Sequence, residues 1–88
     1  MLDIENKIIS VVEKLDHELA SSESNEILKL VKMHGEYGIA LENLCSILEK
    51  RAIPISTDLL EEIIELFRLM DFSNDVLVYY RKHLVTCN

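Results

Sequence analysis

The sequence predicts an all-α protein, a single compact bundle of four to five short amphipathic helices that spans residues 1–88 as one domain. Hydrophobic residues make up 49 % of the chain but aromatic residues only 6 %, a composition that favours aliphatic helix packing. Two glycines and one proline leave few breaks in regular structure. Apolar residues also recur at spacings of three and four along most of the chain, as they do in amphipathic helices.

The first two helices are predicted within residues 3–34. From Asp3 to about His17, apolar positions fall on one helical face: Ile8, Val11, Val12, Leu15 and Leu19. The polar cluster 21–25 then offers several N-caps for a second helix, whose apolar positions are Ile27, Leu30 and Val31. Gly35 predicts the end of that helix, because glycine readily takes the left-handed conformation that follows a helix end.

A third helix is predicted over residues 36–51. Its buried face would carry Tyr37, Ala40, Leu41, Leu44, Ile47 and Leu48. Pro54 closes this helix, since a residue before proline is driven out of the helical region. Ser56 is placed as the N-cap of the next helix, with Ile55 and Leu60 at the two positions of a hydrophobic staple.

The last two helices follow the same logic. The fourth is strongly amphipathic, and its apolar positions are Leu59, Leu60, Ile63, Ile64, Leu66, Phe67 and Met70. Ser73 is the predicted N-cap of a fifth helix, with Phe72 and Leu77 as its staple. Residues 76–80 are rich in β-branched and aromatic types and therefore also fit a strand. We favour a helix because the sequence shows no partner strand.

Charge narrows the possible partners. The net charge of −7 argues against direct binding of nucleic acid or an anionic membrane, because both require a basic surface. A basic protein is the expected partner. The N-terminal residues lack the basic region of a signal peptide, and no apolar run is long enough to cross a bilayer, so a cytoplasmic location is expected. Cys45 and Cys87 are expected to be reduced thiols.

The most specific pattern is the segment HGEYGIALENL at residues 34–44, followed by Ile-Pro-Ile-Ser at residues 53–56. An aromatic residue between two glycines begins a predicted helix rich in Ala and Leu, which ends before the sequence Ile-Pro-Ile. Over residues 33–72 this pattern resembles small bacterial immunity proteins of the MafI type or the CdiI-like type of contact-dependent growth inhibition. The resemblance implies a protein that binds and neutralises the C-terminal domain of a cognate toxin, often a basic nuclease such as an RNase or tRNase.

Two sets of residues are candidate partner contacts. The first is an acidic stripe on the fourth helix formed by Asp58, Glu61, Glu62 and Glu65, which are spaced three, four and seven residues apart. The second consists of Glu36, Tyr37 and Glu42, of which the first two match the Glu-aromatic pair of the immunity-protein pattern. The stripe equally fits a solvated face, and Tyr37 equally fits a core position with its hydroxyl at the surface.

Catalytic chemistry is not expected. The chain has no nucleophile motif, no glycine-rich phosphate loop and no recognised metal-ligand spacing beyond His83 and Cys87, which are too few ligands for zinc. We therefore expect no catalytic residues, no metal and no cofactor. An acyl carrier is excluded because the sequence has no Asp-Ser dipeptide. A helical adaptor or regulatory domain that binds another cellular protein stays as the alternative, and the oligomeric state stays open.

Overall fold

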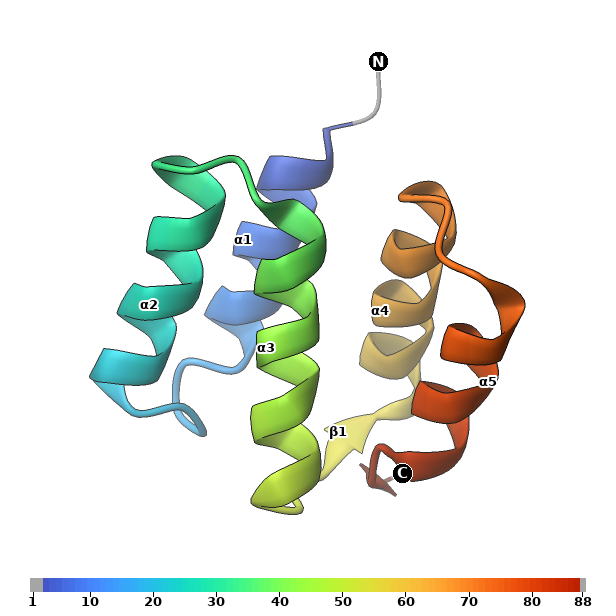
Figure 1. The fold of residues 1–88 in the computed structure, drawn as a ribbon. Coiled ribbons are helices and arrows are strands. Elements are labelled where there is room, and N and C mark those ends of the chain that lie inside the picture. The colour runs from blue at the N-terminus through green and yellow to red at the C-terminus, as the bar shows by residue number, and fades with distance from the viewer. Residues whose placement is uncertain (1–2, 88) are drawn as a thin grey trace. The chain divides into compact units, whose positions relative to one another are not determined.

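A computed structural model describes residues 3–87, whose regular structure consists of five helices and a two-stranded parallel sheet (Figure 1). The all-α prediction is therefore confirmed. In chain order the elements are α1 (Ile4–Lys14), α2 (Ser21–Lys32), α3 (Tyr37–Lys50), β1 (Ile55–Ser56), α4 (Thr57–Leu69), α5 (Asn74–His83) and β2 (Thr86–Cys87).

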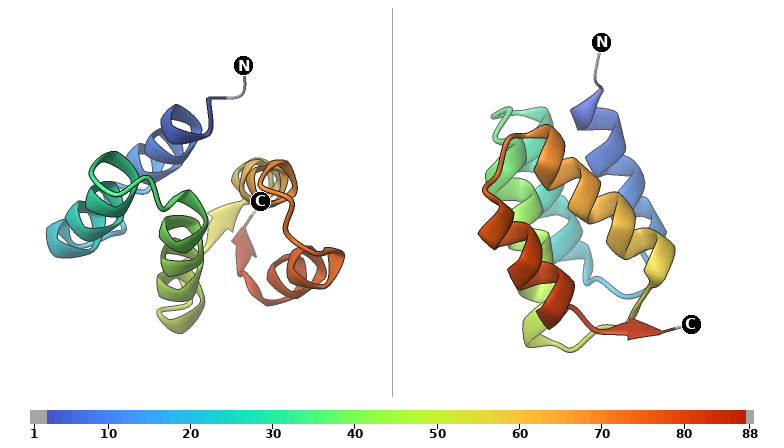
Figure 2. Two further views of the ribbon diagram at one scale, coloured as in Figure 1. Left: turned by 45° about the horizontal axis from the view of Figure 1, so that its top comes forward. Right: turned by 90° about the vertical axis from the view of Figure 1, so that its right-hand side faces the viewer.

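The chain forms two compact units, one that extends to Leu44 and one that begins at Cys45 (Figure 2). Helix α3 runs through this boundary, so its first residues belong to the N-terminal unit and its last turns to the C-terminal unit. Each unit is described by itself below. Within residues 3–87, no helix combines the length and apolar character needed to cross a bilayer.

Helices α1 and α2 pack against each other in the N-terminal unit. Asp3 caps α1, because its side chain accepts a 3.1 Å hydrogen bond from the backbone N–H of Asn6. The helix ends at Lys14, three residues before the predicted end near His17. Hydrogen-bonded turns follow the end of the helix, and one of their bonds, 2.9 Å long, runs from the N–H of Glu18 to the carbonyl of Leu15. The side chain of Leu15 is buried there, as predicted.

The start of α2 differs in detail from the prediction. The serines of the polar cluster lie inside the first turn of the helix, and Ala20 occupies the N-cap position. Alanine has no side-chain acceptor, so the cap depends on Glu23, whose carboxylate accepts a 2.8 Å hydrogen bond from the N–H of Ala20. Glu23 at the third helical position therefore replaces the serine cap that was predicted.

Most of the predicted buried face of α3 is confirmed. Ala40, Leu41, Leu44 and Leu48 are buried, while Tyr37 and Ile47 are only half-buried. Cys45 is also fully buried, and neither it nor the exposed Cys87 belongs to a disulfide.

In the C-terminal unit, β1 and β2 form a parallel pair that the sequence did not predict. Ile55 pairs with Thr86 and Ser56 with Cys87, and the N–H of Ile55 donates a 2.9 Å hydrogen bond to the carbonyl of Val85. Two residues per strand are too few to show an alternating pattern. The strand alternative for residues 76–80 is wrong, since these residues lie within α5.

Helices α4 and α5 contact each other around an aromatic cluster. The ring of Phe67, fully buried on α4, lies 4.9 Å from the ring of Phe72 in an edge-on arrangement and 4.9 Å from that of Tyr80 in a stacked one. Both are favourable aromatic geometries. None of the α5 side chains is fully buried, so stacking on Phe67 is an important attachment of this β-branched helix.

Candidate protein-interaction surfaces

The turn between α2 and α3 is built around Gly35, which has a φ of +62°. This left-handed conformation costs little for glycine, because it has no Cβ atom to clash with the backbone. The N–H of Glu36 donates a 3.0 Å hydrogen bond back to the carbonyl of Leu30 in α2. The carbonyl of Glu36 accepts a 2.9 Å bond from Ala40 in α3. Glu36 thus joins the end of one helix to the beginning of the next.

Tyr37 is fixed by α1. Its hydroxyl donates a 3.2 Å hydrogen bond to Oε1 of Glu5, and its side chain is half-buried. This hydrogen bond raises the pKa of the Tyr37 hydroxyl above its ordinary value of 10.0, and desolvation and the negative charges of Glu5 and Asp3 raise this pKa further. The hydroxyl of Tyr37 is therefore engaged within the chain, and only part of the ring is accessible to a partner.

Two large hydrophobic side chains beside this turn are exposed. Met33, at the end of α2, is 73 % exposed, and Ile39, in the first turn of α3, is 49 % exposed. Ile39 lies three residues before Glu42, so these two side chains are neighbours on the surface of α3, and Glu36 immediately precedes the helix. Glu36 and Glu42 are both exposed. We call the surface formed by Met33, Glu36, Ile39 and Glu42 the α2–α3 corner.

The two glutamates of this corner were candidate contacts from the sequence, whereas its apolar members Met33 and Ile39 were not. Ile39 was detectable in principle, because it falls outside the buried face that was predicted for residues 36–51. Met33 was not detectable by periodicity, since it lies at the very end of a helix, where the chain turns away.

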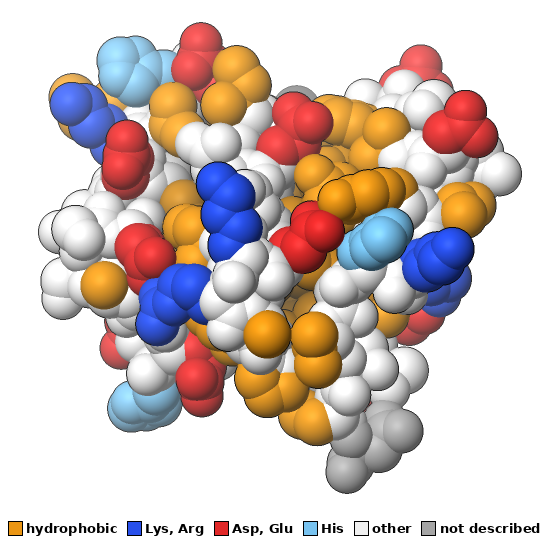
Figure 3. Space-filling view, turned by 60° about the horizontal axis from the view of Figure 1, so that its bottom comes forward, with side chains coloured by type: hydrophobic (Ala, Val, Ile, Leu, Met, Phe, Trp, Pro, Cys, Tyr) orange, Lys and Arg blue, Asp and Glu red, His pale blue; other side chains and the backbone are white. Residues whose placement is uncertain are grey.

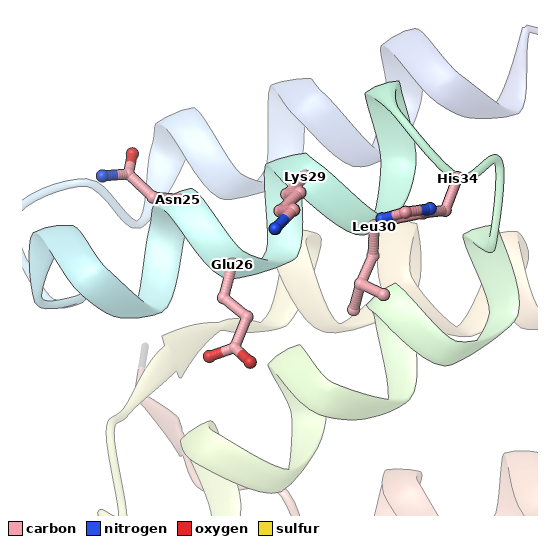
Figure 4. Close-up of a pocket in the computed structure, with 5 residues that line it drawn as sticks. All are labelled: Asn25, Glu26, Lys29, Leu30 and His34. Carbon is pink, nitrogen blue, oxygen red and sulfur yellow. The ribbon is translucent and has the colours of Figure 1, made fainter.

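A shallow depression of about 420 Å³ lies on α2. Asn25, Glu26, Lys29 and Leu30 of α2 line it, together with His34 from the turn that follows (Figure 4). One acidic and one basic side chain at its rim give it no strong charge preference. The depression reaches the α2–α3 corner at His34, next to Met33 in the chain.

The predicted acidic stripe on α4 is partly neutralised. Glu61 forms an ion pair with Arg81 of α5, in which Nη2 of Arg81 donates a 3.1 Å hydrogen bond and Nη1 a second one. The hydrogen bond from Arg81 lowers the pKa of the Glu61 carboxyl below its usual value. Glu65 is paired with Arg68, whose Nε donates a 3.0 Å hydrogen bond. The carboxylates of Glu61 and Glu65 are therefore matched by arginines.

A second exposed apolar surface lies on α5. Val78 is 56 % exposed, and Tyr79 also stays at the surface. The hydroxyl of Tyr79 donates to Glu49 of α3 with oxygen distances of 2.8 and 3.0 Å, and this hydrogen bond raises the Tyr79 pKa. The ring of Tyr79 lies 4.3 Å from that of His83. In Figure 3, exposed hydrophobic side chains lie between acidic, basic and histidine side chains.

The described residues offer no cluster for metal chemistry. Within residues 3–87, no three His, Cys, Asp or Glu side chains come together as potential metal ligands. The surfaces described above contain carboxylates and exposed aliphatic side chains, together with tyrosine hydroxyls that are bonded within the chain.

No protein-family model, curated protein or solved structure matches this chain. The Gly-Glu-Tyr-Gly segment at residues 35–38 forms the turn at Gly35 and the first turn of α3.

Proposed function

We propose that this chain is an immunity protein that binds the C-terminal domain of a cognate toxin, a basic nuclease, and thereby neutralises it. The observation that carries the proposal is the pairing of two exposed apolar side chains, Met33 and Ile39, with exposed carboxylates in the segment that resembles immunity proteins. Exposed apolar groups surrounded by charge are typical of surfaces that bind other proteins.

Charge supports a basic partner. The N-terminal unit has nine acidic and four basic residues, a net charge of −5, whereas the C-terminal unit has seven and five, a net charge of −2. A nuclease needs Lys and Arg residues to hold phosphates. Opposite charge accelerates the encounter of two proteins and orients them, while a few central apolar contacts supply most of the binding energy.

The test is to measure binding between this protein and the C-terminal domain encoded immediately upstream of its gene. We expect a Kd of about 1 nM or lower, which corresponds to about −12 kcal/mol. Association should slow markedly as salt rises, because salt screens the attraction between opposite charges. Co-expression should also rescue cells that produce the upstream domain.

The alternative function, a helical adaptor or regulatory domain, predicts a different result. An adaptor would neither bind the upstream domain nor rescue cells from it, and would bind another cellular protein instead. Loss of both binding and rescue would therefore overturn the immunity proposal.

A further inference from the structure

We infer that the α2–α3 corner is the docking surface for this partner, and that the acidic face of α4 is not. The inference rests on the proposed function, because the occupant is the basic toxin domain itself. In this arrangement Met33 and Ile39 enter apolar pockets of the partner, while Glu36 and Glu42 pair with its Lys or Arg side chains.

Met33 and Ile39 form the apolar part of this surface. In residues 3–44 these are the large hydrophobic side chains that stay exposed, while the neighbouring aliphatic positions Val31, Ala40 and Leu41 are buried. Methionine is unbranched and adapts its shape to a partner surface, and isoleucine offers a rigid anchor. Two such groups flanking one turn resemble the apolar centre of a protein interface surrounded by a polar rim.

The corner is also held in place before binding. The N–H of Glu36 bonds to Leu30, and Tyr37 bonds to Glu5, so both helices that border the turn are tied down. A surface that is ordered in the free protein loses little conformational entropy when a partner binds. The hydrogen bond of Tyr37 to Glu5 therefore ties the first turn of α3, where Ile39 lies, to α1.

Charge complementarity points to a cationic occupant. None of the ion pairs within residues 3–87 involves Glu36 or Glu42, so both carboxylates are available to a partner. Asp3 and Glu5 add negative charge close to the hydroxyl of Tyr37. On α4, by contrast, Arg81 and Arg68 already satisfy Glu61 and Glu65.

The exposed surface of α5 fits a basic partner poorly. Val78 and Tyr79 lie next to the last turn of α5, which contains Lys82 and His83 as well as Arg81, the partner of Glu61. Like charges across an interface oppose association.

At the α2–α3 corner, Lys29 and Lys32 lie in the last turn of α2 before Met33, so the negative charge of this surface lies on its α3 side, at Glu36 and Glu42. There the exposed side chain of Ile39 lies beside carboxylates that are open to a cationic partner.

The experiment compares matched variants in binding to the C-terminal domain encoded immediately upstream. Met33→Ala and Ile39→Ala together should weaken the equilibrium affinity at least tenfold, mainly through faster dissociation. Val78→Ala with Val85→Ala is the control, because it removes two similarly exposed aliphatic side chains from the C-terminal unit and should change the affinity less than threefold.

A second pair of variants tests the charges. Glu36→Gln with Glu42→Gln should slow association and reduce its salt dependence, while Asp58→Asn with Glu62→Gln should leave both nearly unchanged. Circular dichroism checks that each variant is folded, which we expect because these side chains are exposed.

The outcomes separate the two proposals. If the wild-type chain does not bind the upstream domain, the proposed function fails and the docking inference fails with it. If the wild-type chain binds tightly and the corner variants bind equally well, while the α4 or α5 variants lose affinity, only the docking inference is overturned.

Discussion

The hydroxyl of Tyr37 donates a 3.2 Å hydrogen bond to Oε1 of Glu5, and thereby joins the beginning of α3 to the first turn of α1. This bond, the desolvation of the hydroxyl and the charges of Glu5 and Asp3 raise the Tyr37 pKa above 10.0. Because the pKa is higher in the folded chain than in the unfolded one, the bond contributes its full stability below pH 10. That stability is lost as the pH rises through the folded-state value.

We therefore predict that Glu5→Gln lowers the Tyr37 pKa toward its ordinary value. The measurement is a pH titration of phenolate absorbance, with Tyr37→Phe used to assign the signal. Tyr79→Phe is a useful comparison, because Tyr79 also has a raised pKa but its partner is Glu49. An unchanged Tyr37 titration in Glu5→Gln would contradict the assignment of Glu5 as its partner.

Gly35→Ala should destabilise the protein by about 1 kcal/mol, because an alanine side chain strains a residue with a φ of +62°. The space around the site is not the cause, since a Cβ atom at Gly35 would meet nothing within 4 Å. Gly35→Asn is the matched control and should cost less, because asparagine tolerates the left-handed conformation. Chemical denaturation gives both values, and equal losses for the two variants would argue against backbone strain.

Ser56 and Ser73 offer a direct comparison of two helix caps. The hydroxyl of Ser56 accepts a 3.1 Å hydrogen bond from the N–H of Leu59, whereas Ser73 stands at an N-cap position but makes no such side-chain bond. Ser56→Ala should therefore cost about 1 kcal/mol, and Ser73→Ala clearly less. Urea unfolding of both variants tests this order, and a larger loss for Ser73→Ala would show that the two caps are assigned wrongly.

Phe67→Ala should be the most damaging single change in the C-terminal unit. The ring is fully buried and contacts both Phe72 and Tyr80, so its removal leaves a cavity and ends two aromatic contacts. A loss of about 3–5 kcal/mol is expected, a large share of the total stability of a small protein. Val78→Ala, at an exposed site, should change stability by less than about 0.5 kcal/mol in the same denaturation experiment.

The ion pair between Glu61 and Arg81 predicts a pH effect of opposite sign to that of Tyr37. The pKa of Glu61 is lower in the folded chain than in the unfolded chain, so the ion pair stabilises the folded protein at pH values above the pKa of the unfolded chain. This stabilisation is lost as the pH falls through the pKa of the folded chain. Arg81→Gln should raise the Glu61 pKa toward 4.5. Carboxyl chemical shifts measured by NMR report this change. Arg68→Gln should leave the pKa read from the Glu61 carboxyl chemical shift unchanged, since Arg68 is paired with Glu65.

Helices were predictable because their signals are local. The apolar spacing of α4, its cap at Ser56 and the stop at Pro54 all lie within a few residues of the structure that they specify. Even the β-branched run of α5 was assigned correctly, since a strand requires a neighbour that the sequence did not show. Ser73 shows the limit of this reasoning, because a suitable residue at a cap position does not guarantee that its side chain bonds there.

Contacts between distant residues were not predictable. The partner of Tyr37 lies 32 residues away and that of Glu61 lies 20 residues away, so no helical spacing connects them. As a result, the stripe on α4 was described without Arg81. Of the proposed docking surface, Glu36 and Glu42 were candidate contacts from the sequence, Glu36 through the immunity-protein pattern, but the exposure of Met33 depends on how the chain turns at Gly35.

The parallel pairing of β1 with β2 constrains the order in which the C-terminal unit can form during synthesis. A ribosome releases β1 before α4 and α5, and β2 only after both of them. During that interval the N–H of Ile55 lacks its native acceptor, the carbonyl of Val85. The cap of α4 can form as soon as Ser56 and Leu59 are present, because its hydrogen bond is local. The sheet cannot form until β2 has been made. A chain that ended at His83 would contain the segments of α4 and α5 but could not form the pairing of Ile55 with Thr86 and of Ser56 with Cys87.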